Sequence, residues 1–147
     1  MKKLIVLLIL TMSLIANDII VKESSCSVDI TVQNIKNILK AKNLSTFAII
    51  NHHINAKSVD MKLNESKVII FGNPKLGSGL MQQNMKVGLD LPMRILVYMD
   101  TDSKVKMAYR NGTWLESKHI LRTSQKIKKM NRAMDKITRK AGTCIKE

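Results

Sequence analysis

Two short segments in which apolar and polar residues largely alternate set the strongest limit on this fold. Residues 93–99 read MRILVYM, residues 104–110 read KVKMAYR, and the turn-forming residues DTDS separate them. Alternation with a period of two places successive side chains on opposite faces of a strand, and a short polar turn joins antiparallel neighbours. The sequence therefore predicts a β-hairpin in a sheet that has one solvated face.

A helix is predicted over residues 29–43, DITVQNIKNILKAKN. Asp29 or Thr31 can cap its start, and Asn43 suits the left-handed residue that ends many helices. Its apolar residues recur at helical spacing and form one stripe. That stripe comprises Val32, Ile35, Ile38, Leu39 and Ala41.

A second, longer amphipathic helix is predicted to begin at Thr123 or Ser124 and to stop at Gly142. Its apolar stripe comprises Ile127, Met130, Met134, Ile137 and Ala141. Its polar face carries a basic stripe, which is most often a solvated surface and alternatively docks onto an anionic membrane or an acidic partner. The basic stripe comprises Lys129, Arg132, Lys136, Arg139 and Lys140.

Three further β-rich segments complete the element order: residues 19–21, STFAIINHH at 45–53 and KVIIFGN at 67–73. The order is then strand, helix, four strands, helix. This order favours an α+β domain with two layers, in which both helices cover one face of a mostly antiparallel sheet.

The first 16 residues have the layout of a secretory signal peptide. Lys2 and Lys3 precede an apolar stretch, and Ala16 stands before the polar pair Asn17 and Asp18. We therefore expect cleavage after Ala16, a periplasmic or secreted protein, and a single domain over residues 17–147. An N-terminal membrane anchor is the alternative, although the apolar stretch is shorter than the roughly 20 residues that a membrane span needs.

The chain has two cysteines, Cys26 and Cys144, near the ends of the expected mature domain. An exported location favours their oxidation to a disulfide, and two free structural thiols are the alternative.

The chain is strongly basic, with 25 Lys and Arg residues against 11 Asp and Glu residues and a formal net charge of +14. Loss of Lys2 and Lys3 with the signal peptide leaves +12. In an exported protein such a charge indicates an anionic membrane surface, an anionic ligand or an acidic partner. The few aromatic residues are scattered and offer no stacking platform for single strands, which argues against nucleic-acid binding.

Four segments carry a resemblance to a known family: INHHINAKSVDMKL, VIIFGNPKLGSGLM, GLDLPMRILVYMD and YRNGTWLESKHIL. Together they resemble the domain-of-unknown-function family numbered 302, from about residue 19 to residue 141. The resemblance implies a compact β-α-β4-α domain that pairs as a homodimer, with no established activity. We also expect a homodimer because an open sheet leaves edges and a face that two helices do not cover.

The family pattern falls on residues 51–53, 71–75 and 90–92, and its late histidine falls on His119. This chain departs from the pattern at Asn51, where an acid is usual, and at residues 110–112, where RNG replaces Asn-Asp-Pro. The resemblance therefore supports no role that needs a carboxylate at those places.

The segment FGNPKLGSGLM at 71–81 is the candidate site. Its glycines allow a close approach of the backbone, the amide groups of a short helix predicted over 80–85 would point at a ligand, and a lysine adds charge. We predict a polar-ligand or anion site, and a structural crossover or dimer contact is the alternative. The predicted residues are Asn73, Lys75, Gly77, Ser78 and Gly79, with His52, Asp90 and His119 beside them.

Binding is favoured over catalysis. Ser78 with Asp90 and a histidine supplies the residue types of a nucleophilic triad, but residue types without geometry occur in any chain. The alternatives are a small periplasmic hydrolase or redox enzyme, and a copper- or haem-binding protein with His52, His119, Met81 and Met85 as ligands. No cofactor is identified by the sequence.

Overall fold

A five-stranded antiparallel sheet forms the centre of the protein, in a computed structural model that describes residues 18–122 and 124–144. The strand order is β1-β5-β4-β3-β2, so both the first and the second strand lie at edges. The expected signal peptide and the candidate helix cap Thr123 lie outside the described residues. The strands are β1 (Ile20–Ser24), β2 (Ser45–Asn51), β3 (Ser66–Gly72), β4 (Met93–Met99) and β5 (Val105–Tyr109).

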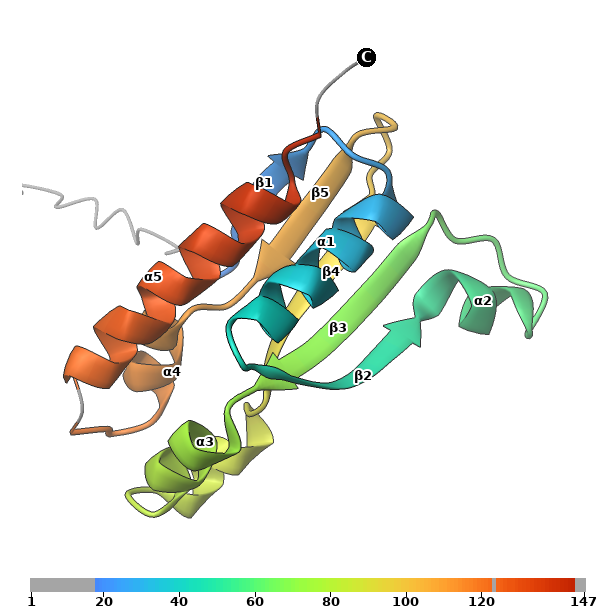
Figure 1. The fold of residues 1–147 in the computed structure, drawn as a ribbon. Coiled ribbons are helices and arrows are strands. Elements are labelled where there is room, and N and C mark those ends of the chain that lie inside the picture. Colours follow the sequence, from blue (N-terminus) through green and yellow to red (C-terminus); the bar gives the residue numbers. More distant parts are fainter. Residues whose placement is uncertain (1–17, 123, 145–147) are drawn as a thin grey trace, which may run out of the picture.

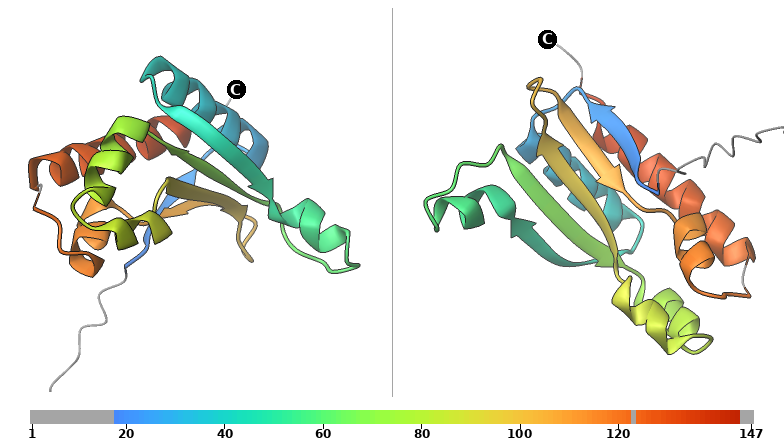
Figure 2. Two further views of the ribbon diagram at one scale, coloured as in Figure 1. Left: turned by 90° about the horizontal axis from the view of Figure 1, so that it is seen from below. Right: turned by 180° about the vertical axis from the view of Figure 1, so that it is seen from behind.

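Two long helices, α1 (Val28–Ala41) and α5 (Ser124–Ala141), lie side by side over one face of this sheet (Figure 1). The predicted α+β class is confirmed. Among the described residues neither long helix covers the opposite face, which we call the open face (Figure 2). No helix within 18–122 and 124–144 is long and apolar enough to cross a membrane.

The main core lies between the helices and the sheet. The inward residues of the predicted hairpin alternate as expected, because each strand turns every second side chain toward the helices. The predicted stripe of α5 is buried throughout, whereas in the predicted stripe of α1 Val32, Ile35 and Leu39 are buried, Ile38 is partly buried and Ala41 is exposed. The almost completely buried members include Ile35, Leu39, Ile69, Ile95, Val97, Met107, Met134 and Ile137.

One row of apolar residues crosses all five strands on the open face. Cross-strand pairing joins Ile50 to Val68, Val68 to Leu96, Leu96 to Ala108 and Ala108 to Val21. Directly paired residues lie on the same face, so the row runs from one edge of the sheet to the other. The open face is therefore apolar at its centre.

Short helices follow the strands at their ends. They are α2 (His52–Lys57), α3 (Pro74–Met81), the 3₁₀ helix η1 (Met85–Leu89) and α4 (Gly112–Lys118). In each, an asparagine precedes the helix, and its side-chain oxygen accepts a backbone N–H of the first turn. These caps are Asn51, Asn73, Asn84 and Asn111.

Three predictions of local structure are corrected by these caps and by Ser27. The strand expected over 45–53 ends at Asn51, because Asn51 begins α2. The helix expected over 80–85 is wrong, since α3 already runs from Pro74 to Met81. Ser27, rather than Asp29 or Thr31, caps α1, whereas the left-handed backbone predicted at Asn43 is confirmed with a φ of 53°.

Asp100 organises the turn between β4 and β5. Its carboxylate accepts the backbone N–H groups of Asp102 and Lys104 at 3.0 and 2.9 Å and forms an ion pair with Lys106. The bond from Lys106, together with the two amides, lowers the pKa of Asp100 below its ordinary value. The charged carboxylate thus fixes the hairpin that supplies the middle of the sheet.

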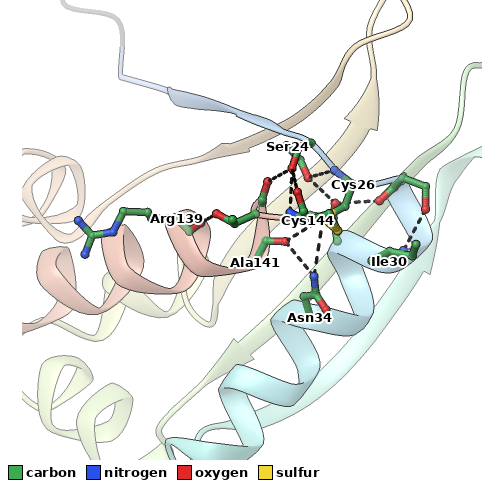
Figure 3. Close-up of a disulfide and its surroundings, with 12 residues drawn as sticks. Ser24, Cys26, Ile30, Asn34, Arg139, Ala141 and Cys144 are labelled. Atoms are coloured by element: carbon green, nitrogen blue, oxygen red, sulfur yellow. Dashed lines mark hydrogen bonds between the residues drawn. A yellow bond between two sulfur atoms is a disulfide. The ribbon is translucent and has the colours of Figure 1, made fainter. Parts of the chain in front are cut away.

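A disulfide between Cys26 and Cys144 ties the start of α1 to the end of α5, as predicted (Figure 3). Hydrogen bonds surround it: the N–H of Cys144 donates to the hydroxyl of Ser25 at 2.8 Å, and the N–H of Ser25 donates to the carbonyl of Gly142 at 2.8 Å. The Asn34 side chain donates to the carbonyl of Ala141 at 3.2 Å. The two helices are therefore held together covalently and by main-chain bonds at one end.

We expect Cys144→Ser to lower the free energy of unfolding by about 2–4 kcal/mol, because the bond closes a long loop that restricts the unfolded chain. The two cysteines are 118 residues apart in sequence. Urea unfolding monitored by circular dichroism measures the change. Parent protein treated with a thiol reductant should match the variant, and Thr143→Ser should match the oxidised parent. Equal midpoints for oxidised and reduced parent would contradict the expectation.

Candidate functional site

The segment expected to be an open loop is a helix in the structure. The side chain of Asn73 accepts the N–H of Leu76 at 3.1 Å, and Pro74 occupies the first turn of α3. The N–H of Gly77 donates to the carbonyl of Asn73 at 2.9 Å, so it does not face a ligand. None of the described glycines has a positive φ. The backbone cradle expected at the glycines is therefore wrong in its geometry, while binding by Asn73, Lys75, Gly77, Ser78 and Gly79 stays a prediction.

An apolar pocket of about 170 Å³ lies between α3 and the segment that leads into β4. Its lining includes Phe47, Leu76, Leu80, Met81 and Leu91. Met81 packs closely on Gly88, where an added Cβ would lie 3.0 Å from the methionine methyl carbon. This pocket offers little but apolar surface, and Met81 serves as packing there.

The predicted histidines lie at opposite ends of the sheet. His52 begins α2 after Asn51, which pairs with Lys67 at the start of β3. His119 ends α4, and its ring Nε2 lies 2.6 Å from Oδ2 of Asp90, the residue after η1. The structure thus brings Asp90 and His119 together and leaves His52 apart from them; Figure 1 shows α2 and α3 far from each other.

This separation bears on the expected metal and triad arrangements. His52 and His119 do not meet, Met85 is 70% exposed, and Met81 lines the apolar pocket. Within 18–122 and 124–144 no cluster of three or more His, Cys, Asp or Glu side chains could hold a metal ion. Ser78 lies in α3 and makes no hydrogen bond to Asp90 or His119 in the described part of the chain.

A second pocket, of about 190 Å³, lies on the open face beside the Asp90–His119 pair, and we call it the open-face pocket. The apolar row supplies its floor with Val68, Leu96 and Ala108. Its polar lining comes from Asp90, Arg94, Arg110 and Asn111, and Trp114 of α4 stands at its side. Three strands and α4 therefore build this pocket.

Two arginines dominate the charge of the open-face pocket. Arg94 is two residues before Leu96 on β4, and Arg110 is two residues after Ala108, the partner of Leu96. Antiparallel register therefore places both arginines at neighbouring positions beyond that pair. The guanidinium of Arg110 lies 4.6 Å from the centre of the Trp114 ring, and Arg94 donates to the carbonyl of Leu89 at 3.2 Å.

The position of Trp114 is fixed by two asparagines. Asn111 accepts the N–H of Trp114 at 3.0 Å, which begins α4. Asn131 of α5 accepts the N–H of Gly112 at 2.7 Å and donates to the Thr113 hydroxyl at 2.6 Å. An added Cβ on Gly112 would lie 3.0 Å from both Asn131 and Met130, so a larger residue would force these side chains to shift. The α4 helix is thereby anchored to α5.

Arg94, Arg110 and Trp114 were not predicted as site residues. A signal for two of the three was present in the sequence. Arg94 lies on the solvated face of the predicted hairpin, and Arg110 begins the RNG stretch that departs from the family pattern. Only the register of the hairpin shows that the two side chains line one pocket.

Solved structures and curated proteins resemble this chain in different ways. A crystal structure of an uncharacterised conserved DUF302 protein from Bacillus stearothermophilus matches with a TM-score of 0.64 and 14% sequence identity, covering 86% of this chain and 94% of the other, which is a likeness of fold. Fluoride-specific ion channel FluC 1 from Brucella suis biovar 1 (strain 1330) is 33% identical over 115 residues, or 78% of this chain and 45% of that protein. FluC 1 from Brucella abortus biovar 1 (strain 9-941) is also 33% identical over 115 residues, or 43% of its length.

This chain thus spans less than half the length of the channels that it resembles. The family described as "Domain of unknown function DUF302" matches residues 20–137, which include every strand and nearly all of α5. The chain belongs to the DUF302 family.

Proposed function

We propose that this protein is an exported, non-catalytic binding module, and that its open-face pocket holds a small organic anion with an apolar body. The observation that carries the proposal is the placement of Arg94 and Arg110 at neighbouring register positions over an apolar floor. Like charges at such positions repel each other, and an anion between them would relieve that repulsion.

The residues of the pocket favour a carboxylate or similar anion in particular. A guanidinium presents several N–H groups in one plane. This geometry suits a carboxylate better than the ammonium group of a lysine, which acts as a point charge. Trp114 orients the guanidinium of Arg110, so less freedom is lost on binding. The apolar floor of Val68, Leu96 and Ala108 then favours a ligand whose body is hydrocarbon.

Of the Asp90–His119 pair, Asp90 lines the open-face pocket. Both side chains already hold each other at 2.6 Å, and no serine, cysteine or lysine lines the described pocket. A carboxylate at the rim also disfavours a second negative group on the ligand and accepts a hydrogen bond from a hydroxyl or amine. The best ligand would therefore carry one anionic end.

The names of the Brucella relatives add one anion to be tested. Those proteins are fluoride-specific ion channels, and more than half of each lies outside the match with this chain. We propose that this chain resembles a binding domain of those proteins, and fluoride therefore belongs in any panel of candidate anions.

Thermal unfolding in sodium benzoate, hexanoate, acetate, phosphate and fluoride at fixed ionic strength tests the pocket. Benzoate or hexanoate should raise Tm of the purified protein in a saturable way. At 100 times Kd the added stability is about 2.7 kcal/mol, which is several degrees for a domain of this size. Arg94→Met should weaken binding roughly 10- to 100-fold, because a charge-assisted hydrogen bond is lost.

Lys75→Ala is the matched control, since Lys75 is a cation of α3 that does not line the open-face pocket. Each variant is compared with its own ligand-free Tm, which removes any change in basal stability. Stabilisation that survives in Arg94→Met and is lost in Lys75→Ala would reject the open-face pocket in favour of α3. Stabilisation that does not saturate, or that is the same for all five salts, would reject a specific site.

Export is the second part of the proposal, and it has two supports. The basic and apolar start of the chain precedes Asn17, and the Cys26–Cys144 disulfide suits an oxidising compartment. N-terminal sequencing of the protein from a fractionated source cell should give Asn17 as the first residue, in the periplasmic or secreted fraction. A retained Met1 in the membrane fraction would instead favour the anchor, and a cytoplasmic fraction would reject both.

We further propose that the protein is a homodimer. The arm formed by β2, α2 and the residues up to β3 supports this, because an edge strand and an unusual number of large apolar side chains are exposed there. The arm extends from the edge of the sheet (Figure 2). Its exposed apolar residues are Phe47, Ile49, Ile50, Ile54, Val59, Met61 and Leu63.

Light scattering after size exclusion should give the mass of a dimer at micromolar concentration. Ile54→Glu should shift the protein to a monomer, because a charge would be buried without a partner in the interface. Ile120→Glu is the control, since Ile120 is 87% exposed and lies outside the arm. A monomer mass for the parent protein, or equal behaviour of the two variants, would reject the arm as the interface.

A further inference from the structure

Helix α5 has one face in the core and one face in solvent, and the two differ completely in chemistry. Met134, Ile137 and Ala141 are buried against the sheet and α1, and Ile127 and Met130 are buried in a second cluster with residues of α3, η1 and α4. The opposite side exposes six cations within 13 residues. They are Lys128, Lys129, Arg132, Lys136, Arg139 and Lys140, and we call them the α5 cationic face.

These cations form a continuous stripe. At 100° per residue the six positions fall within about 120° of the helix circumference, and the rise of 1.5 Å per residue makes the stripe about 18 Å long. Lys126 continues it toward α3, where its ammonium lies near Gly79. No large apolar or aromatic side chain interrupts the stripe from 128 to 140.

The protein itself neutralises little of this charge. Asp135 is the one acidic residue of α5, and its carboxylate bonds to Lys22 of β1 at 2.5 Å. That bond lowers the pKa of Asp135, so the side chain stays charged but is directed toward the sheet. Of the six cations of the α5 cationic face, Arg139 alone forms an ion pair with Asp135, at 4.0 Å. The other five make no ion pair with the described residues.

The position of the stripe in the fold gives it an orientation. Helices α1 and α5 cover one side of the sheet (Figures 1 and 2). The residues that line the open-face pocket include Val68, Leu96 and Ala108 of the apolar row on the other side. A flat surface that contacts α5 would therefore leave the pocket accessible from the opposite side.

We propose that the α5 cationic face docks the protein onto an anionic lipid surface, with the open-face pocket turned away from the membrane. A straight stripe of mostly lysine, without a pocket among its residues, fits an extended layer of negative headgroups better than one small anion. A protein partner would need an apolar centre to its interface, which this stripe lacks, and single-stranded nucleic acid would need aromatic side chains to stack on.

The mode of binding follows from the packing of α5. Interfacial helices insert an apolar face between lipids, but the apolar face of α5 is already buried in the core. Docking therefore rests on charge alone and releases in salt, because the Debye length falls from about 10 Å at 0.1 M to about 3 Å at 1 M. Each cation near the membrane contributes about a fivefold gain in affinity.

Co-sedimentation of the purified protein with vesicles tests this proposal. Vesicles of phosphatidylcholine with about one third phosphatidylglycerol should bind the protein at low salt, and vesicles of phosphatidylcholine alone should not. The triple variant Lys129→Gln, Arg132→Gln and Lys136→Gln should lose about 100-fold in affinity, which is about fivefold for each cation removed. Raising the salt to about 1 M should release the parent protein.

A second triple variant has the same change in net charge and serves as the control. It distinguishes binding through the α5 cationic face from binding through the net charge of the whole protein. Lys57→Gln, Lys62→Gln and Lys86→Gln removes exposed lysines of α2, of the segment before β3 and of η1, all outside the layer formed by α1 and α5, and should weaken binding only a few-fold. Unchanged Tm values confirm that both variants are folded. Equal losses in the two variants, equal binding to neutral vesicles, or binding only to an acidic polymer such as heparin would overturn the proposal.

The vesicle assay tests the docking face independently of the ligand proposal. Arg94→Met should bind vesicles like the parent, because Arg94 lies on the open face. A protein that binds vesicles but no organic anion would reject the pocket and keep the docking face. The reverse result would reject the docking face and keep the pocket.

Discussion

Burial of two helical stripes against only one face of a single sheet is the constraint on which the remaining structure depends. Ile35 and Leu39 of α1 and Met134 and Ile137 of α5 are buried against alternate residues of the strands. Because these side chains use the inner face of every central strand, the outer face is left with the apolar row from Ile50 to Val21. The same packing directs the charged side of α5 into solvent. The pocket and the cationic face are thus two results of one packing arrangement.

Patterns with a regular period could be predicted from the sequence, and they gave the two-layer fold correctly. The hairpin at 93–110 and the stripe of α5 are local patterns, since the period of each element is visible in a short stretch of residues. Helices α2 and α4 were not predicted, because they are too short to show a period and depend on a cap. Asn51 shows the consequence: an acid is usual in the family, but an amide oxygen also accepts the N–H of Ile54.

The candidate site was harder to predict because it is built from distant residues. Asp90 and His119 are 29 positions apart. The sequence predicted that both lie near the candidate site, but not that they form a hydrogen bond at the end of the sheet. Arg94 and Arg110 line one pocket because of the register of β4 and β5, which a single strand does not reveal. The segment at 73–79 attracted attention through its glycines, but Asn73 and Pro74 start a regular helix there. The expected loop geometry is therefore wrong, while ligand binding by these residues stays a prediction.

The disulfide between Cys26 and Cys144 affects what proteolysis does to the protein. It closes a ring that contains α1, four of the five strands and α5. A single cut in any loop inside that ring, including the exposed arm after β2, leaves both fragments covalently joined. The fragments also remain packed through the sheet, so a nicked molecule can keep its shape. Two cuts inside the ring would be needed before any segment of the ring could diffuse away.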